Sequence, residues 1–259
     1  MADHTVGSIL AWLNEQAPFE TQEDFDNAGL QVGHLGQKVT SVLLALDLTS
    51  QVIEEAVRSQ SQLIITHHPL LFVPQRVFDL SAQVPVLIAR LITSGIALIS
   101  AHTNIDQSGK YSSSSVLANQ MGLQNIRREG KYIFLGELPE PMMSDELRQA
   151  IMVCLDAPVR QYGECNKQDI RTLAIAGGAY SEGYIEAIQA GAQALLTGEV
   201  KHHHAVSAAE MGFLLYDGGH FATEAPMLPR IAIGLQKELN TVQYPLLVHL
   251  SQCKPYRLQ

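Results

Sequence analysis

The sequence predicts an α/β protein of two α/β domains, with the smaller domain inserted into the larger. Strand-like and helix-like segments alternate along the chain, and the strand-like segments are short apolar runs typical of buried parallel sheets. A length of 259 residues suits one large domain or two smaller ones. Hydrophobic residues make up 46% and charged residues 17% of the chain, which is ordinary for a globular protein.

The first half of the chain repeats a strand and helix pattern. The segment 50–59 carries Val52, Ile53, Ala56 and Val57 at the spacing of an amphipathic helix. This alternation favours a largely parallel sheet covered by helices. In chain order, the predicted elements are a strand at 42–46, a helix at 50–59, a strand at 63–65, a helix at 84–93, a strand at 96–100 and a helix at 114–121.

The composition changes near residue 127, where two arginines precede a short apolar run and a Pro139-Glu140-Pro141 segment. We place a domain boundary there, so that 127–217 forms the smaller inserted domain and 1–126 with 218–259 forms the main domain. The elements expected after the boundary are helices at 144–154, 181–190 and 231–239 and strands at 172–176, 194–196 and 246–251.

Charge and composition exclude several classes of protein. The formal net charge is -9 and there is no dense block of Lys and Arg, so nucleic-acid binding has no support from charge. Apolar stretches are too short for a membrane span, and the opening residues lack a secretory signal, so we expect a cytoplasmic protein. Three scattered cysteines, Cys154, Cys165 and Cys253, are expected to be reduced bystanders.

Two adjacent histidines and a proline end the apolar run at 63–65. In an extended backbone, His67 and His68 point to opposite faces, so this pair suits two neighbouring metal ions better than one. Pro69 restricts the backbone of His68 and thereby its direction. The structural alternative is a turn satisfied by backbone groups and water.

Two further strand ends carry side chains that commonly bind metals. The carboxyl ends of parallel strands meet at one edge of a sheet, so these residues converge, and we expect a metal site there, in the cleft between the domains. Nitrogen and oxygen ligands without sulfur suit zinc, iron, manganese or nickel. The candidate ligands are His67, His68, Asp106, His220 and Glu224, enough for two divalent ions bridged by a carboxylate.

Each candidate also has a structural interpretation. His102 and His220 are compatible with structural roles, and Asp106 with a helix cap. His220 and Glu224 stand four residues apart, but the two prolines that follow argue against one helix face, so we expect Glu224 in a loop before a helix starting near Pro226 or Pro229.

Five segments, spread over nearly the whole chain, match the motifs of one known family in the same order. They are Asp26-Asn27-Ala28-Gly29-Leu30-Gln31-Val32-Gly33, Ile65-Thr66-His67-His68-Pro69-Leu70, His102-Thr103-Asn104-Ile105-Asp106, Leu196-Thr197-Gly198-Glu199 and Gly219-His220-Phe221-Ala222-Thr223-Glu224. On these segments the chain resembles the Ngg-interacting-factor-like family, often labelled GTP cyclohydrolase I type 2 homologues. The resemblance implies a two-domain α/β protein with a dinuclear metal centre, assembled as a homohexameric ring, with the five candidates as ligands, Glu224 bridging and His102 close by.

The chain departs from the pattern of this family at two places. Tyr180 follows Gly177-Gly178-Ala179, where relatives have glycine before serine, and His203 matches a histidine found in only some relatives. We interpret His203 as an exposed helix start. Glu199 is similarly interpreted as a carboxylate at a helix start, although it could reach the metal site.

The leading hypothesis is a metal-dependent hydrolase, because two neighbouring ions generate a bound hydroxide at neutral pH. His102 is the candidate catalytic residue for proton transfer, or else it orients a ligand. No phosphate-binding loop supports GTP as substrate, so the small-molecule substrate stays open. The alternatives are a metal-binding or metal-delivery protein and a ring-shaped scaffold, both without turnover of their own.

Overall fold

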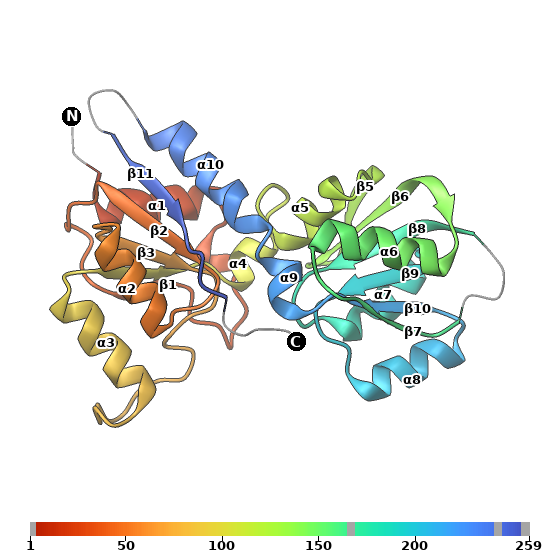
Figure 1. Ribbon diagram of the computed structural model, residues 1–259, viewed down its shortest axis with the longest axis horizontal. Helices are drawn as coiled ribbons and strands as arrows, with labels where there is room; N and C mark the ends of the chain where they lie inside the picture. The colour runs from red at the N-terminus through yellow and green to blue at the C-terminus, as the bar shows by residue number, and fades with distance from the viewer. Residues whose placement is uncertain (1–3, 165–168, 241–244, 255–259) are drawn as a thin grey trace. The chain divides into compact units, whose positions relative to one another are not determined.

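The computed structural model describes residues 4–164, 169–240 and 245–254. Two sheets, each flanked by helices, make up the fold (Figure 1), which confirms the predicted α/β class. Contacts divide the chain into two units, Met1–Ser108 with Leu228–Gln259 and the intervening Gly109–Met227, so the second unit is inserted into the first in sequence. Cys165 lies outside the described residues.

The first unit is built on a five-stranded sheet in the order β1-β4-β3-β2-β11. All neighbouring strands are parallel except the pair β1 and β4. Strands β2, β3 and β4 are buried along their whole length, which explains their continuous apolar sequences. The strands are β1 (Gly29–Val32), β2 (Ser41–Ala45), β3 (Leu63–Thr66), β4 (Ala97–Ser100) and β11 (Leu247–Leu250).

Helices α2 and α3 cover one face of this sheet. Val52 and Ile53 of α2 and Leu87 of α3 pack with Leu43 and Leu98 of the strands in one buried cluster. Thr49 caps α2 by accepting a hydrogen bond from the Val52 amide. The helical elements of this unit are α1 (Val6–Gln16), η1 (Phe19–Thr21), α2 (Ser50–Arg58), α3 (Gln83–Thr93), α4 (Thr103–Asp106) and α10 (Met227–Leu239), whose first residue the division assigns to the second unit.

The second unit is built on a six-stranded sheet in the order β5-β6-β8-β9-β10-β7. Strands β8, β9 and β10 run parallel, and the outer pairs are antiparallel. The strands are β5 (Gln124–Glu129), β6 (Ile133–Met142), β7 (Arg160–Tyr162), β8 (Ile170–Ala176), β9 (Ala194–Thr197) and β10 (Leu214–Asp217).

Helices cover both faces of the second sheet. Leu117 of α5 and Ile151 of α6 belong to one core cluster, while Tyr184 of α7 and Ala208 of α8 belong to another. The arrangement is thus a three-layer α/β/α unit. Its helical elements are α5 (Ser113–Gln120), α6 (Ser144–Leu155), η2 (Ser181–Gly183), α7 (Tyr184–Gln189), α8 (His202–Glu210) and α9 (His220–Glu224).

The contact-based division assigns α5, β5 and α9 to the second unit. The domain boundaries predicted from the sequence put 109–126 and 218–227 in the main domain instead. These segments fall in the second unit because α5 packs on β6, β8 and α9, and because β5 is hydrogen-bonded to β6. The limits of independently folding domains, 1–126 with 218–259 and 127–217, stay a prediction.

Glu55 on α2 fastens the residues that follow β11. Ser251 Oγ donates to Glu55 Oε2 at 2.6 Å, and the Gln252 amide donates to Oε1 at 3.1 Å. Partial burial raises the pKa of Glu55, but hydrogen bonds from Ser251, Gln252 and Cys253 outweigh it and lower the pKa below the ordinary 4.5. The ionised form is therefore the one that the fold stabilises.

Glu55→Ala is expected to lower the free energy of unfolding by about 1 kcal/mol or less, because these bonds are partly exposed. A lowered folded-state pKa stabilises above the unfolded value and loses its effect as pH falls through the folded value. Urea unfolding at stepwise lower pH should therefore show the difference from the parent shrink below the ordinary 4.5. Glu54→Ala, which removes an exposed ion pair with Arg90, is the matched control; equal losses in both variants would contradict this account.

Candidate metal centre

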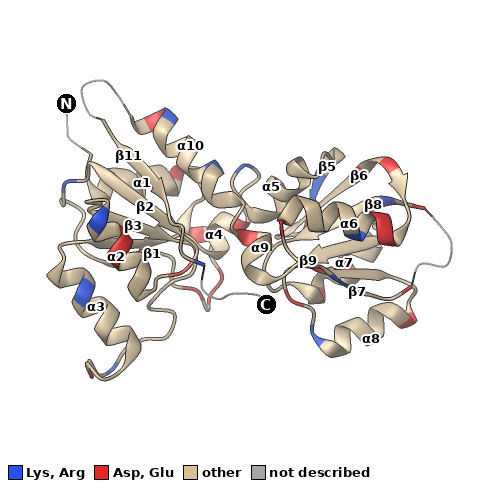
Figure 2. Cartoon of the chain, viewed as in Figure 1, with Lys and Arg blue, Asp and Glu red and all other residues tan. Residues whose placement is uncertain are grey.

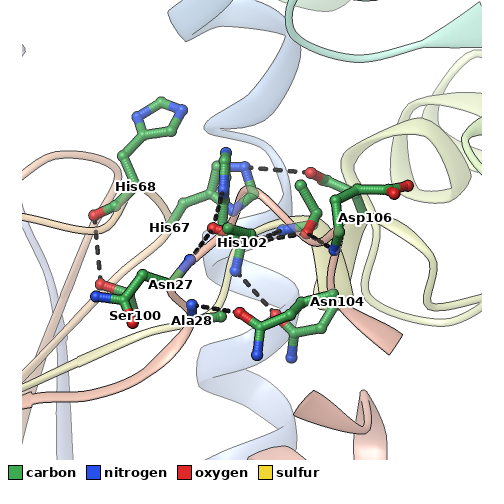
Figure 3. Close-up of polar contacts among 12 residues, drawn as sticks. Asn27, Ala28, His67, His68, Ser100, His102, Asn104 and Asp106 are labelled. Carbon is green, nitrogen blue, oxygen red and sulfur yellow. Dashed lines mark hydrogen bonds and ion pairs between the residues drawn. The ribbon is translucent and has the colours of Figure 1, made fainter. Parts of the chain in front are cut away.

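The chain bends immediately after β3, which changes how the two adjacent histidines point. The amides of His67 and His68 both donate to the carbonyl of Leu46, at 3.1 and 3.0 Å. Thr66 Oγ1 then holds the His68 carbonyl at 2.9 Å, and Ser100 Oγ lies at 3.4 Å from the same oxygen (Figure 3). The strand ends at Thr66, so the alternation expected of an extended backbone does not apply, and the two ring centroids are 4.9 Å apart.

His102 joins this pair from the end of the neighbouring strand β4. Its ring centroid lies 5.0 Å from that of His67 and 5.5 Å from that of His68. One ring nitrogen from each of the three histidines lies within 4.8 Å of the others, a spacing that could hold a metal ion. Asp106, at the end of the single-turn helix α4, places Oδ2 3.6 Å from His67 Nε2 (Figure 3). We call these four residues the histidine cluster.

Every imidazole of the histidine cluster uses Nδ1 for a hydrogen bond to a fixed oxygen. His67 Nδ1 bonds to the Ala101 carbonyl at 2.8 Å, His68 Nδ1 to Asp47 at 2.8 Å, and His102 Nδ1 to Asp26 at 2.8 Å. Each acceptor is a carbonyl or carboxylate oxygen, so Nδ1 carries the proton and Nε2 keeps the lone pair. Metal-binding histidines are oriented in the same way.

Among the residues that supply these oxygens, Asp26 is held by the most hydrogen bonds described here. Its side chain is fully buried and accepts hydrogen bonds from His102 Nδ1 and from the Thr103 amide at 3.0 Å. Burial raises the pKa of Asp26, but the hydrogen bonds from His102 and Thr103 outweigh burial and hold the pKa well below its usual range. Asp26 is therefore ionised over the physiological pH range and favours a proton on Nδ1 of His102.

In the second unit, His220 and Glu224 lie on one face of the short helix α9. His220 Nε2 is 3.1 Å from Glu224 Oε2, and only 4% of Glu224 is exposed. The expectation that Glu224 occupies a loop is wrong. Helix α9 ends at Glu224, before the first proline, so neither Pro226 nor Pro229 removes a hydrogen bond from it. We call these two residues the α9 pair.

Glu199 orients the imidazole of the α9 pair. Its Oε1 lies 2.7 Å from His220 Nδ1. Like the histidines of the first unit, His220 therefore bonds to an oxygen through Nδ1. The interpretation of Glu199 as a helix-start carboxylate is wrong, because α8 begins only at His202. His203 is exposed at the start of α8, as expected.

Three glycines let the strand ends of the second unit approach the α9 pair closely. A Cβ atom on Gly178 would lie 2.1 Å from Glu224 Oε1, and one on Gly198 would lie 2.9 Å from the His220 Cα. A Cβ on Gly177 would meet Ser113 Cβ at 2.9 Å and Thr223 O at 3.1 Å. A side chain at Gly198 would therefore press on the backbone of α9, whereas one at Gly178 would press on the carboxyl group of Glu224.

Thr223 links these glycines to α9. It is fully buried, and its Oγ1 lies 3.1 Å from the Gly178 amide, which donates to it, and 2.9 Å from the Gly219 carbonyl. Helix α9 is thus fixed to the Gly178 amide, just after β8, by the side chain of Thr223.

The donor chemistry of each unit fits a divalent transition metal. In each unit, oriented imidazole nitrogens and a carboxylate are donors suited to zinc, iron, manganese or nickel. The first unit brings together His67, His68, His102 and Asp106, and the second brings together His220 and Glu224.

Sequence reasoning gave no role to Asp47 or Asp26. Asp47 follows the end of β2, so the strand-end rule that found the histidines could have found it. Asp26 precedes β1, and only its contact with His102 reveals its role.

The comparisons with known proteins place the whole chain in one family. A family model described as Duf34/NIF3 (NGG1p interacting factor 3) matches residues 4–256. The chain belongs to this family. Two relatives named GTP cyclohydrolase 1 type 2 homolog are similar over most of their length: one from Clostridium acetobutylicum is 29% identical and covers 95% of this chain and 96% of its own, and one from Clostridium perfringens is 31% identical and covers 91% and 93%.

Solved structures of the Duf34/NIF3 type share the fold. A hypothetical protein of Staphylococcus aureus is 27% identical with a TM-score of 0.92, and both chains are covered completely. A Bacillus cereus protein related to NIF3 has a TM-score of 0.91 at 20% identity, again over both full chains, which shows the common fold.

The Duf34/NIF3 chain shows two further features that bear on its class. Among the helices of the described residues, none is long and apolar enough to cross a membrane.

Tyr180 is the residue at which the glycine loop departs from the family pattern. Its ring centroid lies 5.1 Å from that of Tyr132, and its amide donates to Thr197 at 3.3 Å. The loop around this tyrosine is therefore anchored within the second unit.

Proposed function

We propose that this protein is a metal-dependent hydrolase with two divalent ions, zinc, iron, manganese or nickel. The single observation that carries the proposal is the common orientation of the three imidazoles among the proposed ligands, each with Nδ1 bonded to an oxygen. Such outer contacts raise the basicity of a ligand and fix its direction. The proposed ligands are His67, His68, Asp106, His220 and Glu224.

The proposed ligands come from both the histidine cluster and the α9 pair. Glu224 is the proposed bridging carboxylate, because its oxygens lie on the same helix face as His220 and are almost completely buried. When bound, two such ions activate a water molecule at neutral pH and polarise the bond under attack.

His102 is the proposed catalytic residue. Its Nδ1 proton is held by Asp26, so Nε2 can accept a proton while the imidazolium is stabilised by the neighbouring carboxylate. The same geometry would also serve if His102 only oriented the site. A pH profile of turnover for His102→Gln separates the two roles.

The names of the relatives suggest hydrolytic opening of the guanine ring of GTP. A phosphoester, a cyclic amide and a modified nucleotide are the alternative substrates for the same activated water. Helices α2, α3 and α6 each contain one arginine and no lysine, and Figure 2 shows no basic patch on these elements for nucleic acid. We further propose a cytoplasmic homohexameric ring, as the family resemblance implies.

Turnover tests this function. The zinc-loaded and manganese-loaded protein should hydrolyse at least one member of a panel of phosphoesters, cyclic amides and nucleotides including GTP, and Asp106→Asn should lose that activity. Transfer of metal to an apo-acceptor without hydrolysis of any panel member would instead identify a metal-delivery protein and contradict the proposal.

A further inference from the structure

Two phenyl rings lie exposed beside the histidine cluster. Phe25 is 64% exposed and Phe72 is 45% exposed, and their ring centroids are 6.2 Å apart with planes inclined at 57°. The ring of Phe72 also stands edge-on to His102, with centroids 6.1 Å apart. We call Phe25 and Phe72 the aromatic pair. The aromatic pair is thus exposed to solvent and also contacts His102, the proposed catalytic residue.

The backbone on both sides of the aromatic pair is fixed by polar contacts. Next to Phe25, Asp26 bonds to His102, and Asn27 Nδ2 donates to the Leu71 carbonyl at 2.8 Å, beside Phe72. The amide of Leu71 in turn donates to Gln31 Oε1 at 3.0 Å. The backbone beside each ring is therefore fixed although neither ring is buried, and such preorganisation lowers the entropic cost of binding a ligand.

The aromatic pair is not explained by the core of the first unit. Large apolar side chains are usually buried, and their exposure together marks a binding surface. The segment that follows Phe72 contains other exposed apolar side chains: Val73, Val77, Phe78 and Leu80. Of the exposed apolar side chains in this segment, Phe72 is the one with a ring contact to His102 among the described contacts.

We propose that the aromatic pair is a subsite for the planar heterocyclic ring of the substrate. This inference rests on the proposed function, because it places the ring beside His102. Phenyl faces bind flat rings through stacking and edge-to-face contacts, which aliphatic groups cannot reproduce. A ring seated on Phe72 is one ring contact away from His102 and hence next to the reacting centre.

The aromatic pair by itself has the size of a small-molecule subsite. A phenyl ring buries at most about 150–250 Å², so two part-exposed rings suit one heterocycle. A second copy of the chain would need about 800 Å² from each partner and would have to cover Val73, Val77, Phe78 and Leu80 as well.

Nucleoside binding to the zinc-loaded protein tests the subsite, measured by calorimetry with uridine and guanosine as probes. Dihydrouridine, whose ring is saturated and puckered, and ribose are the matched non-aromatic controls. We expect uridine and guanosine to bind about tenfold or more tightly than these controls. The preference should disappear in Phe72→Leu and weaken in Phe25→Leu, because leucine keeps apolar bulk without a flat face.

Zinc content of the same samples separates this inference from the proposed function. Full zinc content with equal affinities for uridine and dihydrouridine, or with no binding of either nucleoside, would overturn the subsite alone. A ring preference in a protein that binds neither zinc nor manganese would overturn the proposed function alone. If Phe72→Leu changes the assembly mass in light scattering and leaves nucleoside affinity unchanged, the aromatic pair belongs to a contact between copies, and the subsite is wrong.

Discussion

His68→Ala is expected to lower the affinity for zinc about 100-fold or more. Outer contacts alone change metal affinity 10- to 100-fold, and this substitution removes both a proposed ligand and the outer contact with Asp47. The side chain of His68 is 26% exposed, so its loss should change the stability of the metal-free protein little. Zinc titration with a competing chelator, alongside thermal unfolding in EDTA, measures the two effects separately.

His34→Ala is the matched control for this prediction. His34 is exposed in the same unit, and its alanine variant should bind zinc like the parent. Equal zinc affinity in the parent and His68→Ala would remove His68 from the ligand set.

Gly198→Ala is expected to displace α9 and thereby weaken metal binding. The added Cβ would lie 2.5 Å from Thr223 Oγ1, 2.9 Å from the Gly178 carbonyl and 2.9 Å from the His220 Cα. Two of these contacts are with backbone, which cannot rotate away, so we expect a loss of about 1–3 kcal/mol of stability. Zinc affinity should fall about tenfold or more, because the α9 pair moves with its helix.

Gly109→Ala is the control for the effect of an added methyl group. No atom lies within 4 Å of a Cβ built at Gly109, and its backbone is outside the left-handed region. This variant should be as stable as the parent or slightly more stable. If Gly198→Ala matched Gly109→Ala in both stability and zinc affinity, close approach of β9 to α9 would not matter for the site.

The elements that the sequence predicted best are those whose signal is local. Strands β3 and β4 are fully buried apolar runs, and their predicted bounds, 63–65 and 96–100, differ from the observed ones by one residue. Helix α1 was not assigned, although Val6, Ile9 and Leu13 carry its buried face at helical spacing. The strand-end rule also singled out the four side chains that form the histidine cluster.

The parts that sequence reasoning missed depend on contacts between distant residues. Asp26 meets His102 across 76 positions, and Glu199 meets His220 across 21, so no local pattern reveals either pair. Helix α9 was missed for a different reason. The two prolines were weighed as helix breakers, but the helix is one turn long and ends before them.

Metal content per chain tests the central claim most directly. Protein purified without added metal, then dialysed against zinc or manganese and freed of excess ion, can be analysed by elemental and native mass spectrometry. The account predicts about two equivalents of divalent metal per chain in the parent, and a sharp loss in His68→Ala and Glu224→Ala. A parent that holds no metal under either condition would contradict it.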